Sequence, residues 1–82
     1  MMKQHPSQTL REALGLSQVA FAAEIGSSQP TVSQVEAGVY GYGKPTILAI
    51  VERWRPQCIE LGITVESLMR GIEGGEDEVA AR

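Results

Sequence analysis

The feature of the sequence that most constrains the fold is a glycine between two short segments with helical spacing of apolar residues. Phe21 and Ile25 lie on one face of the first segment, and Val32 and Val35 lie on one face of the second. Gly26, between the segments, can adopt the left-handed conformation that ends a helix abruptly. The pattern therefore predicts two short helices joined by a turn of about three residues.

Helix start signals continue along the chain, and no alternating pattern of strand length interrupts them. The residues at which helices are expected to begin are Ser7, Ser17, Ser28, Pro45 and Thr64. Pro56 predicts a break near Arg55 and then a short helical piece to Leu61, because proline cannot donate the backbone hydrogen bond of a helix interior. We therefore predict an all-α fold with five main helices.

The distribution of charge divides the chain into a domain and a tail. A chain of 82 residues is long enough for one compact domain. Its net charge of −3 at first argues against binding to nucleic acid. Within residues 1–72, however, six basic and six acidic side chains cancel. We expect residues 1–72 to form the domain and residues 73–82 to form a flexible acidic tail. The tail would either aid solubility or temper binding to DNA.

The composition gives little support for catalysis, cofactor binding or membrane insertion. The only cysteine, Cys58, cannot form an internal disulfide or a metal site alone, and we expect it in a core or an interface. The only histidine, His5, precedes Pro6 in an expected loose terminus, and no nucleophile and acid are grouped with it. The longest apolar run, from Ile47 to Val51, is too short for a bilayer, and the N-terminus is polar. We therefore expect a cytoplasmic protein that is not an enzyme and binds no cofactor or metal.

The second of the two short helices would present an uncharged outer surface. With its valines facing inward, the residues expected to face outward are Pro30, Ser33, Gln34 and Ala37, with Gln29 at the helix start. Compact, uncharged side chains would let the helix approach a major groove closely. A glutamine amide can bond N6 and N7 of adenine together, serine can bond either kind of base edge, and small apolar side chains can pack on thymine methyl groups. These five residues are the predicted base contacts, although a solvated helix face would carry the same pattern.

The segment from Gln18 to Ala37 resembles the repressor and Cro (Xre-type) helix-turn-helix proteins of phages and bacteria. The matching positions are the small residue Ala22, the glycines Gly26 and Gly38, and the apolar residues Phe21, Ile25, Val32 and Val35. A looser resemblance extends from Leu10 and through residues 64–71. The resemblance to this family implies a lambda-repressor-like fold. It also implies the function of a sequence-specific DNA-binding transcriptional regulator, most often a repressor. The sequence departs from the family in a longer loop after Gly38 and in extra residues around Pro56.

The resemblance also implies roles for three further residues. Arg11 and Glu36 match a buried ion pair that joins the first helix to the recognition helix, and Gln18 matches a glutamine that contacts a DNA phosphate. Further candidates for phosphate contacts are Thr31, Tyr40, Tyr42 and Lys44, although the two tyrosines could equally pack against the domain.

One short recognition helix reads few base pairs, so we expect a homodimer bound to an inverted repeat in a double-stranded DNA operator. The apolar side chains available for a dimer interface in the C-terminal half are Trp54, Ile59, Leu61, Ile63 and Met69. Trp54 is the first choice because tryptophan is enriched at interface centres, but it could also belong to the core. The alternative function is a protein-interaction module on the same fold, such as an antitoxin or a partner-binding regulator.

Overall fold

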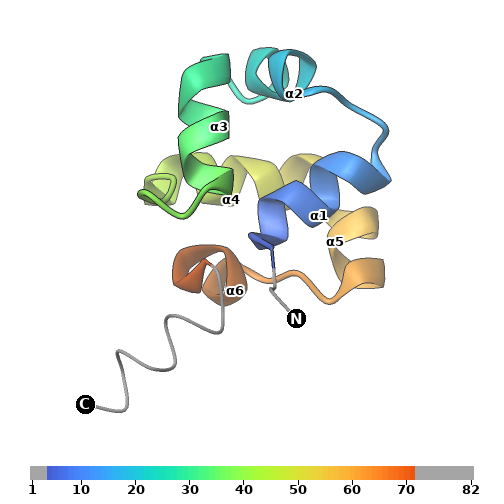
Figure 1. Cartoon of the computed structure of the whole chain (residues 1–82). Coiled ribbons are helices and arrows are strands. Elements are labelled where there is room, and N and C mark those ends of the chain that lie inside the picture. The colour runs from blue at the N-terminus through green and yellow to red at the C-terminus, as the bar shows by residue number, and fades with distance from the viewer. Residues whose placement is uncertain (1–3, 72–82) are drawn as a thin grey trace, which may run out of the picture.

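The computed structural model describes residues 4–71, which fold into six helices (Figure 1). They are α1 (Pro6–Ala13), α2 (Gln18–Glu24), α3 (Gln29–Glu36), α4 (Lys44–Arg53), α5 (Arg55–Leu61) and α6 (Val65–Arg70). No strand is present within this range, so the all-α prediction is confirmed. The number of five is corrected to six, because the short piece expected after the break is a helix of its own, α5, which starts directly after Trp54. The acidic tail expected at residues 73–82 lies outside the described residues.

Side-chain caps fix the starts of most of these helices. Ser17 Oγ accepts a hydrogen bond from the Ala20 N–H at 3.0 Å, and Ser28 and Thr64 cap α3 and α6 in the same way. The expected cap at Ser7 is wrong. The cap of α1 is His5, whose Nδ1 accepts the Ser7 N–H at 3.1 Å, and Pro6 follows it at the first helical position. Proline suits that position because its missing N–H would have had no partner in the helix.

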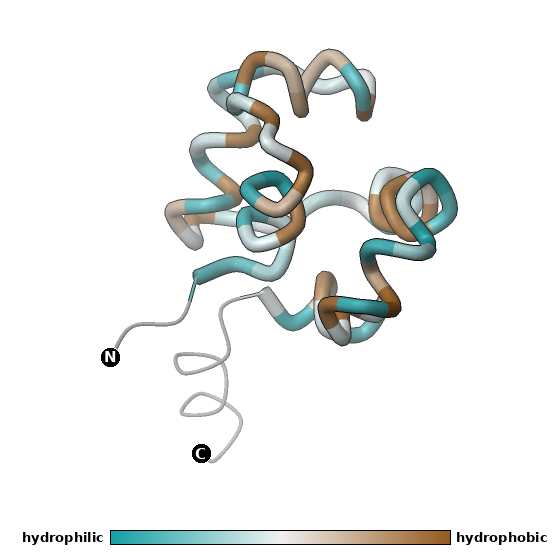
Figure 2. The backbone as a smooth tube through the Cα atoms, turned by 90° about the vertical axis from the view of Figure 1, so that its right-hand side faces the viewer, coloured by the Kyte–Doolittle hydropathy of each residue, from teal (hydrophilic) through white to brown (hydrophobic). Residues whose placement is uncertain are grey.

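Every helix contributes to a single apolar core. The buried apolar residues of this cluster are Leu10, Phe21, Ala22, Val32, Ile47, Ile50, Cys58, Ile63 and Leu68. Cys58 is therefore a core residue, one of the two environments expected for it. Figure 2 shows apolar residues separated by polar ones along the helices, as expected where each helix buries one side. This holds for α4 as well, because Leu48 and Ala49 are exposed while Ile47 and Ile50 are buried.

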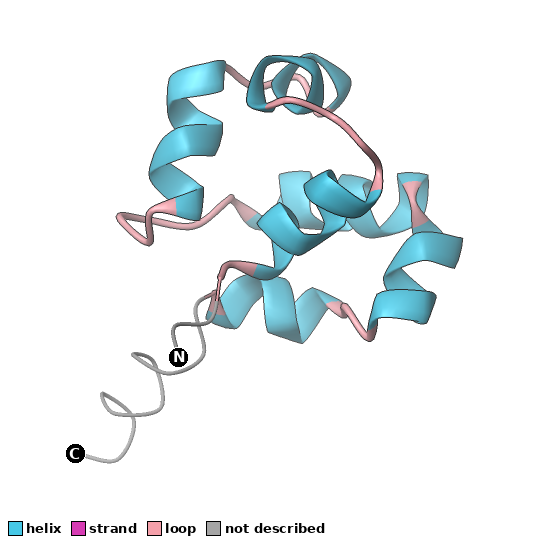
Figure 3. Ribbon diagram, turned by 45° about the vertical axis from the view of Figure 1, so that its right-hand side comes forward, coloured by secondary structure: helices cyan, strands magenta, loops and turns pink. Residues whose placement is uncertain are grey.

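The α2 and α3 helices form one end of the domain, away from both ends of the chain (Figures 1 and 3). Between them the chain turns at Gly26, which has a left-handed φ of +69°. The two helices pack directly against each other, and Phe21 of α2 and Val32 of α3 enter the core together. The predicted pair of short helices with a tight turn is therefore present, and α3 lies at the surface with one side buried.

Candidate nucleic-acid interface

The outer surface of α3 carries the residues predicted to contact bases. Val32 and Val35 are fully buried on the inner side. On the outer side the exposed residues are Pro30, Gln34 and Ala37, and Ser33 is half-buried beside them. None of these side chains carries a charge, and Gln34 is the longest of them. This surface can approach another macromolecule closely and offer it one freely extended amide.

Gln29 lies at the first position of α3 and is fixed by a neighbouring side chain. Its Nε2 donates a hydrogen bond to Oε1 of Gln18, at the first position of α2, over 2.7 Å. Gln18 in turn donates from its Nε2 to Oε1 of Glu36 at 3.0 Å. Both glutamines are half-buried, so the start of each helix contributes an amide whose orientation is constrained.

The ion pair implied by the resemblance, between Arg11 and Glu36, is present in the structure. Arg11 Nε donates to Glu36 Oε2 at 2.7 Å and its Nη2 donates to Oε1 at 3.2 Å. A further hydrogen bond of 2.8 Å joins Arg11 Nη1 to the carbonyl oxygen of Leu16. The side chains of Arg11 and Glu36 are only 14% and 6% exposed, and the hydrogen bonding to Glu36 raises the pKa of Arg11. The pair fastens α1 to the C-terminal end of α3.

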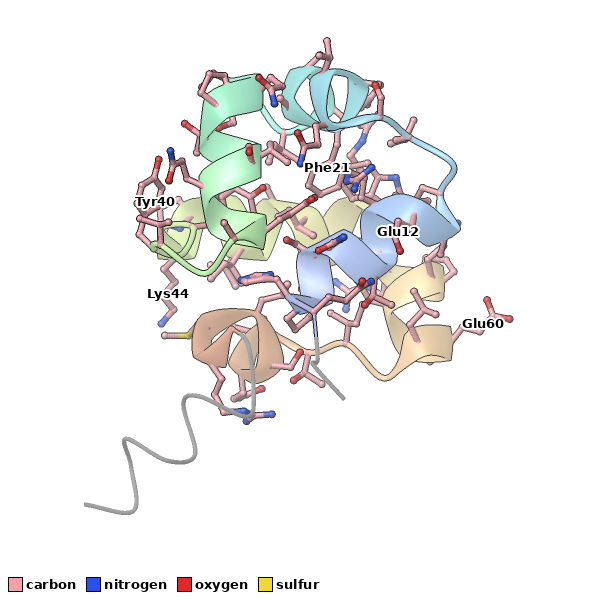
Figure 4. The ribbon with its side chains drawn as sticks, in the orientation of Figure 1. Glu12, Phe21, Tyr40, Lys44 and Glu60 are labelled. Carbon is pink, nitrogen blue, oxygen red and sulfur yellow. The ribbon has the colours of Figure 1, made fainter. Side chains whose placement is uncertain are left out.

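The loop after α3 and the start of α4 carry two of the candidate phosphate contacts in accessible positions. Both Tyr40 and Lys44 are exposed, and Figure 4 shows Tyr40 beside α3 and Lys44 extending from the start of α4 toward α6. Thr31 is half-buried, and its Oγ1 accepts a hydrogen bond from Ser28 Oγ at 2.9 Å. A hydroxyl and an ammonium group at this edge could hold a phosphate next to the α3 surface.

Tyr42 is not available to a phosphate, which corrects its proposed role. Its hydroxyl is buried, and its ring packs against the core. The ring meets the imidazole of His5 edge to face, with centroids 6.4 Å apart. Burial, together with the nearby Glu36 carboxylate, raises the pKa of Tyr42 to about 12. Tyr42 therefore anchors the loop to the start of α1 instead of reaching outward.

His5 is the residue whose place the sequence interpretation misjudged most. It is 2% exposed, not loose. Its Nδ1 accepts the N–H of Ser7 and lies 2.9 Å from the Ser7 hydroxyl. Burial lowers the pKa of His5, and the nearby Glu36 carboxylate opposes this effect in part. The signal that could have found it is the His5-Pro6 pair at a helix start, because the residue before a first-turn proline occupies the cap position.

A comparison with protein families shows which family the chain belongs to. The model of a helix-turn-helix family, HTH_3, matches residues 8–52, which include α2 and α3 and most of α1 and α4. The chain belongs to this helix-turn-helix family. Among curated proteins and among solved structures, none matches the chain significantly.

Family membership makes the chain a DNA-binding transcription regulator of the Xre/Cro-like family, with a lambda-repressor-like fold. The family is one of regulators and not typically of enzymes. The match covers the Arg11–Glu36 ion pair and the outer surface of α3. It also covers Gln18 and Gln29, whose linked amides we call the amide chain. Within residues 4–71 no helix is long and apolar enough to cross a membrane, the longest being the ten residues of α4.

Two of the predicted dimer-interface residues of this helix-turn-helix protein pack against its core, and one of them is buried. Ile63 is only 7% exposed and lies in the core, so its assignment to an interface is wrong. Trp54 is half-buried and stacks on Phe21 with ring centroids 5.3 Å apart, while Arg53 lies over its ring. Its packing is mainly internal. Ile59, Leu61 and Met69 remain exposed, and Ile59 is the most accessible of them at 73%.

Proposed function

We propose that the protein is a sequence-specific transcriptional repressor that inserts α3 into the major groove of its operator. The observation that carries the proposal is the amphipathic character of α3, whose valines are buried and whose outer surface is exposed and uncharged. This helix lies within the part of the chain that matches the helix-turn-helix family. Bound at a promoter, a domain of this size would act by occupying the site and excluding other proteins.

The assignment of base contacts follows from the chemistry of the outer surface. Gln34 is exposed and free to place its amide against N6 and N7 of adenine, and Gln29 can do the same at the helix start. Ser33 could bond to either kind of base edge. Pro30 and Ala37 carry small apolar surfaces that suit thymine methyl groups. Sequence preference would thus be carried mainly by two amides.

Phosphate contacts would come from both edges of α3. Tyr40 and Lys44 are exposed at one edge, and the half-buried Thr31 and Gln18 would supply contacts at the other. Lys44 is the only cation in this set, and Arg11 is consumed by its pair with Glu36. Affinity should therefore depend only weakly on salt for a DNA-binding protein.

The working unit would be a two-fold dimer on an inverted repeat with half-sites about 10 base pairs apart. Exposed apolar side chains on α5 and α6, above all Ile59 and Met69, support this part of the proposal. Sedimentation at micromolar concentration would test it. Ile59→Asp should convert a dimer to a folded monomer. The control is Val19→Asp on α2, where Val19 is 65% exposed and Ile59 is 73% exposed, and this substitution should not affect dimerisation. A wild-type protein that is monomeric and binds one half-site as a single copy would refute the dimer.

Selection of bound duplexes from a random DNA pool at low salt tests the function itself. The expected result is a short inverted repeat with adenine at one or two positions of each half-site. A reporter driven by a promoter that overlaps this site should then be silenced. Failure to enrich any sequence would contradict DNA reading and favour the alternative of a protein-interaction module.

A further inference from the structure

We propose that Glu36 determines which base Gln29 reads, because its carboxylate fixes the orientation of two successive amides. This inference rests on the proposed base-reading role of α3. Glu36 itself is too deeply buried to touch DNA, with a side chain only 6% exposed, so it would act as a positioning residue.

The first step is the salt bridge of Glu36. Two nitrogens of Arg11 donate to its two oxygens, at 2.7 Å and 3.2 Å. An ionised carboxylate can only accept hydrogen bonds. Any amide that faces it must therefore present nitrogen, and Gln18 does so with Nε2 at 3.0 Å.

The second step passes this constraint from α2 to α3. With one N–H of its amide turned to Glu36, Gln18 presents its oxygen to Gln29. An amide oxygen is also only an acceptor, so Gln29 must answer with nitrogen. The observed distance of 2.7 Å from Gln29 Nε2 to Gln18 Oε1 agrees with this orientation. The charge on Glu36 thus sets the orientation of an amide that it does not touch.

The third step concerns the base. One N–H of Gln29 is used by Gln18, which leaves its Oε1 and its second N–H, in a fixed spatial order. Adenine offers a donor at N6 and an acceptor at N7, so it can satisfy both groups when that order matches. If the amide could turn over, donor and acceptor would exchange places. Discrimination at that base pair would then fall, although the same residues would still touch the DNA.

We call the hydrogen-bonded series from Glu36 through Gln18 to Gln29 the relay. Four variants test it on the duplex selected from a random pool. Gln29→Ala first identifies the base pair that Gln29 reads. Glu36→Gln replaces the acceptor-only group by an amide that can face Gln18 either way. Gln18→Met removes the link and leaves the ion pair intact. Glu24→Gln, in an exposed ion pair with Arg53, is the matched control for removal of a carboxylate charge.

Binding is measured by competition against duplexes changed at each position in turn. We expect Glu36→Gln and Gln18→Met to lose roughly tenfold in discrimination at the base pair of Gln29 and nowhere else. Glu24→Gln should retain the wild-type profile. In a Gln29→Ala background neither substitution should change the profile further.

The relay is overturned if the two variants weaken binding equally to all sequences, which is what a purely structural role would produce, or if their profiles equal that of the wild type. Should Glu36→Gln fail to fold, Gln18→Met alone decides, since it keeps the contacts of Arg11 with Glu36. A wild-type protein that selects no duplex would refute the proposed function as a whole. If the wild type selects a duplex but Glu36→Gln and Gln18→Met leave discrimination at the base pair of Gln29 unchanged, only the relay is refuted.

Discussion

Removal of the Glu36 carboxylate should destabilise the fold far more than removal of any exposed carboxylate. In Glu36→Ala, the Arg11 guanidinium keeps its 2.8 Å hydrogen bond to the Leu16 carbonyl but loses both contacts with Glu36. A charge that is only 14% exposed would then have no close counter-ion except Glu12, at 3.9 Å. Breaking a buried ion pair on one side costs about 3–5 kcal/mol. Because Arg11 retains one hydrogen bond and limited access to water, we expect about 3 kcal/mol.

The chain contains its own control for this measurement. Glu24 pairs with Arg53, and both side chains are substantially exposed, at 40% and 54%. Such pairs contribute at most about 1 kcal/mol, so Glu24→Ala should shift stability by no more than that. Urea unfolding followed by circular dichroism gives both values. The stacking of Trp54 on Phe21 supplies a second probe, tryptophan fluorescence, that should report the same transition.

The double variant Arg11→Met with Glu36→Leu separates the cost of a stranded charge from the worth of the pair. Apolar replacement of both partners should recover much of the lost stability, because no buried charge remains. If Glu36→Ala unfolds within about 1 kcal/mol of the wild type, as Glu24→Ala does, then the pair contributes no more than a surface contact. That result would refute the reasoning.

Three further outcomes are expected. Burial holds the pKa of His5 below its ordinary 6.5, so stability should be full above that pH and fall as pH decreases below it. Urea midpoints measured between pH 5 and 7 should show this loss in the wild type and not in His5→Asn, which can still cap α1. Gln34→Ala should cost about 1–3 kcal/mol on the selected operator and relax preference at one base pair, with little change in non-specific affinity. Lys44→Ala should lower affinity for all sequences alike and reduce the salt slope by about 1, as a titration of affinity against salt would show.

Local signals in the sequence were sufficient to predict the helix-turn-helix segment. They were insufficient to predict the side-chain hydrogen bonds that join its helices. Gly26, Ser17 and Ser28 act through their own backbone neighbours, so their roles can be predicted from spacing. The amide chain through Gln18 joins the first positions of two helices, and only the packing of α2 on α3 brings them together. Glu36 could be assigned from the resemblance as a partner of Arg11. Nothing in the local pattern indicated that it also holds Gln18.

The same distinction explains the error about Ile63 and the two possibilities left open for Trp54. Both residues were counted as a surplus for an interface because the sequence does not reveal how much core a small six-helix domain must fill. In the structure Trp54 covers Phe21, and Ile63 enters the core between α5 and α6.

Tyr42 shows the consequence for the site. Its ring packs inward on His5 and holds the middle of the loop against α1, while Tyr40 before it and Lys44 after it remain exposed. The loop can therefore present a hydroxyl and an ammonium group at the edge of α3 because one of its two tyrosines is not at the surface. Because the ring of Tyr42 meets that of the buried His5, we expect the cap at the start of α1 to support this edge of the proposed DNA-binding surface.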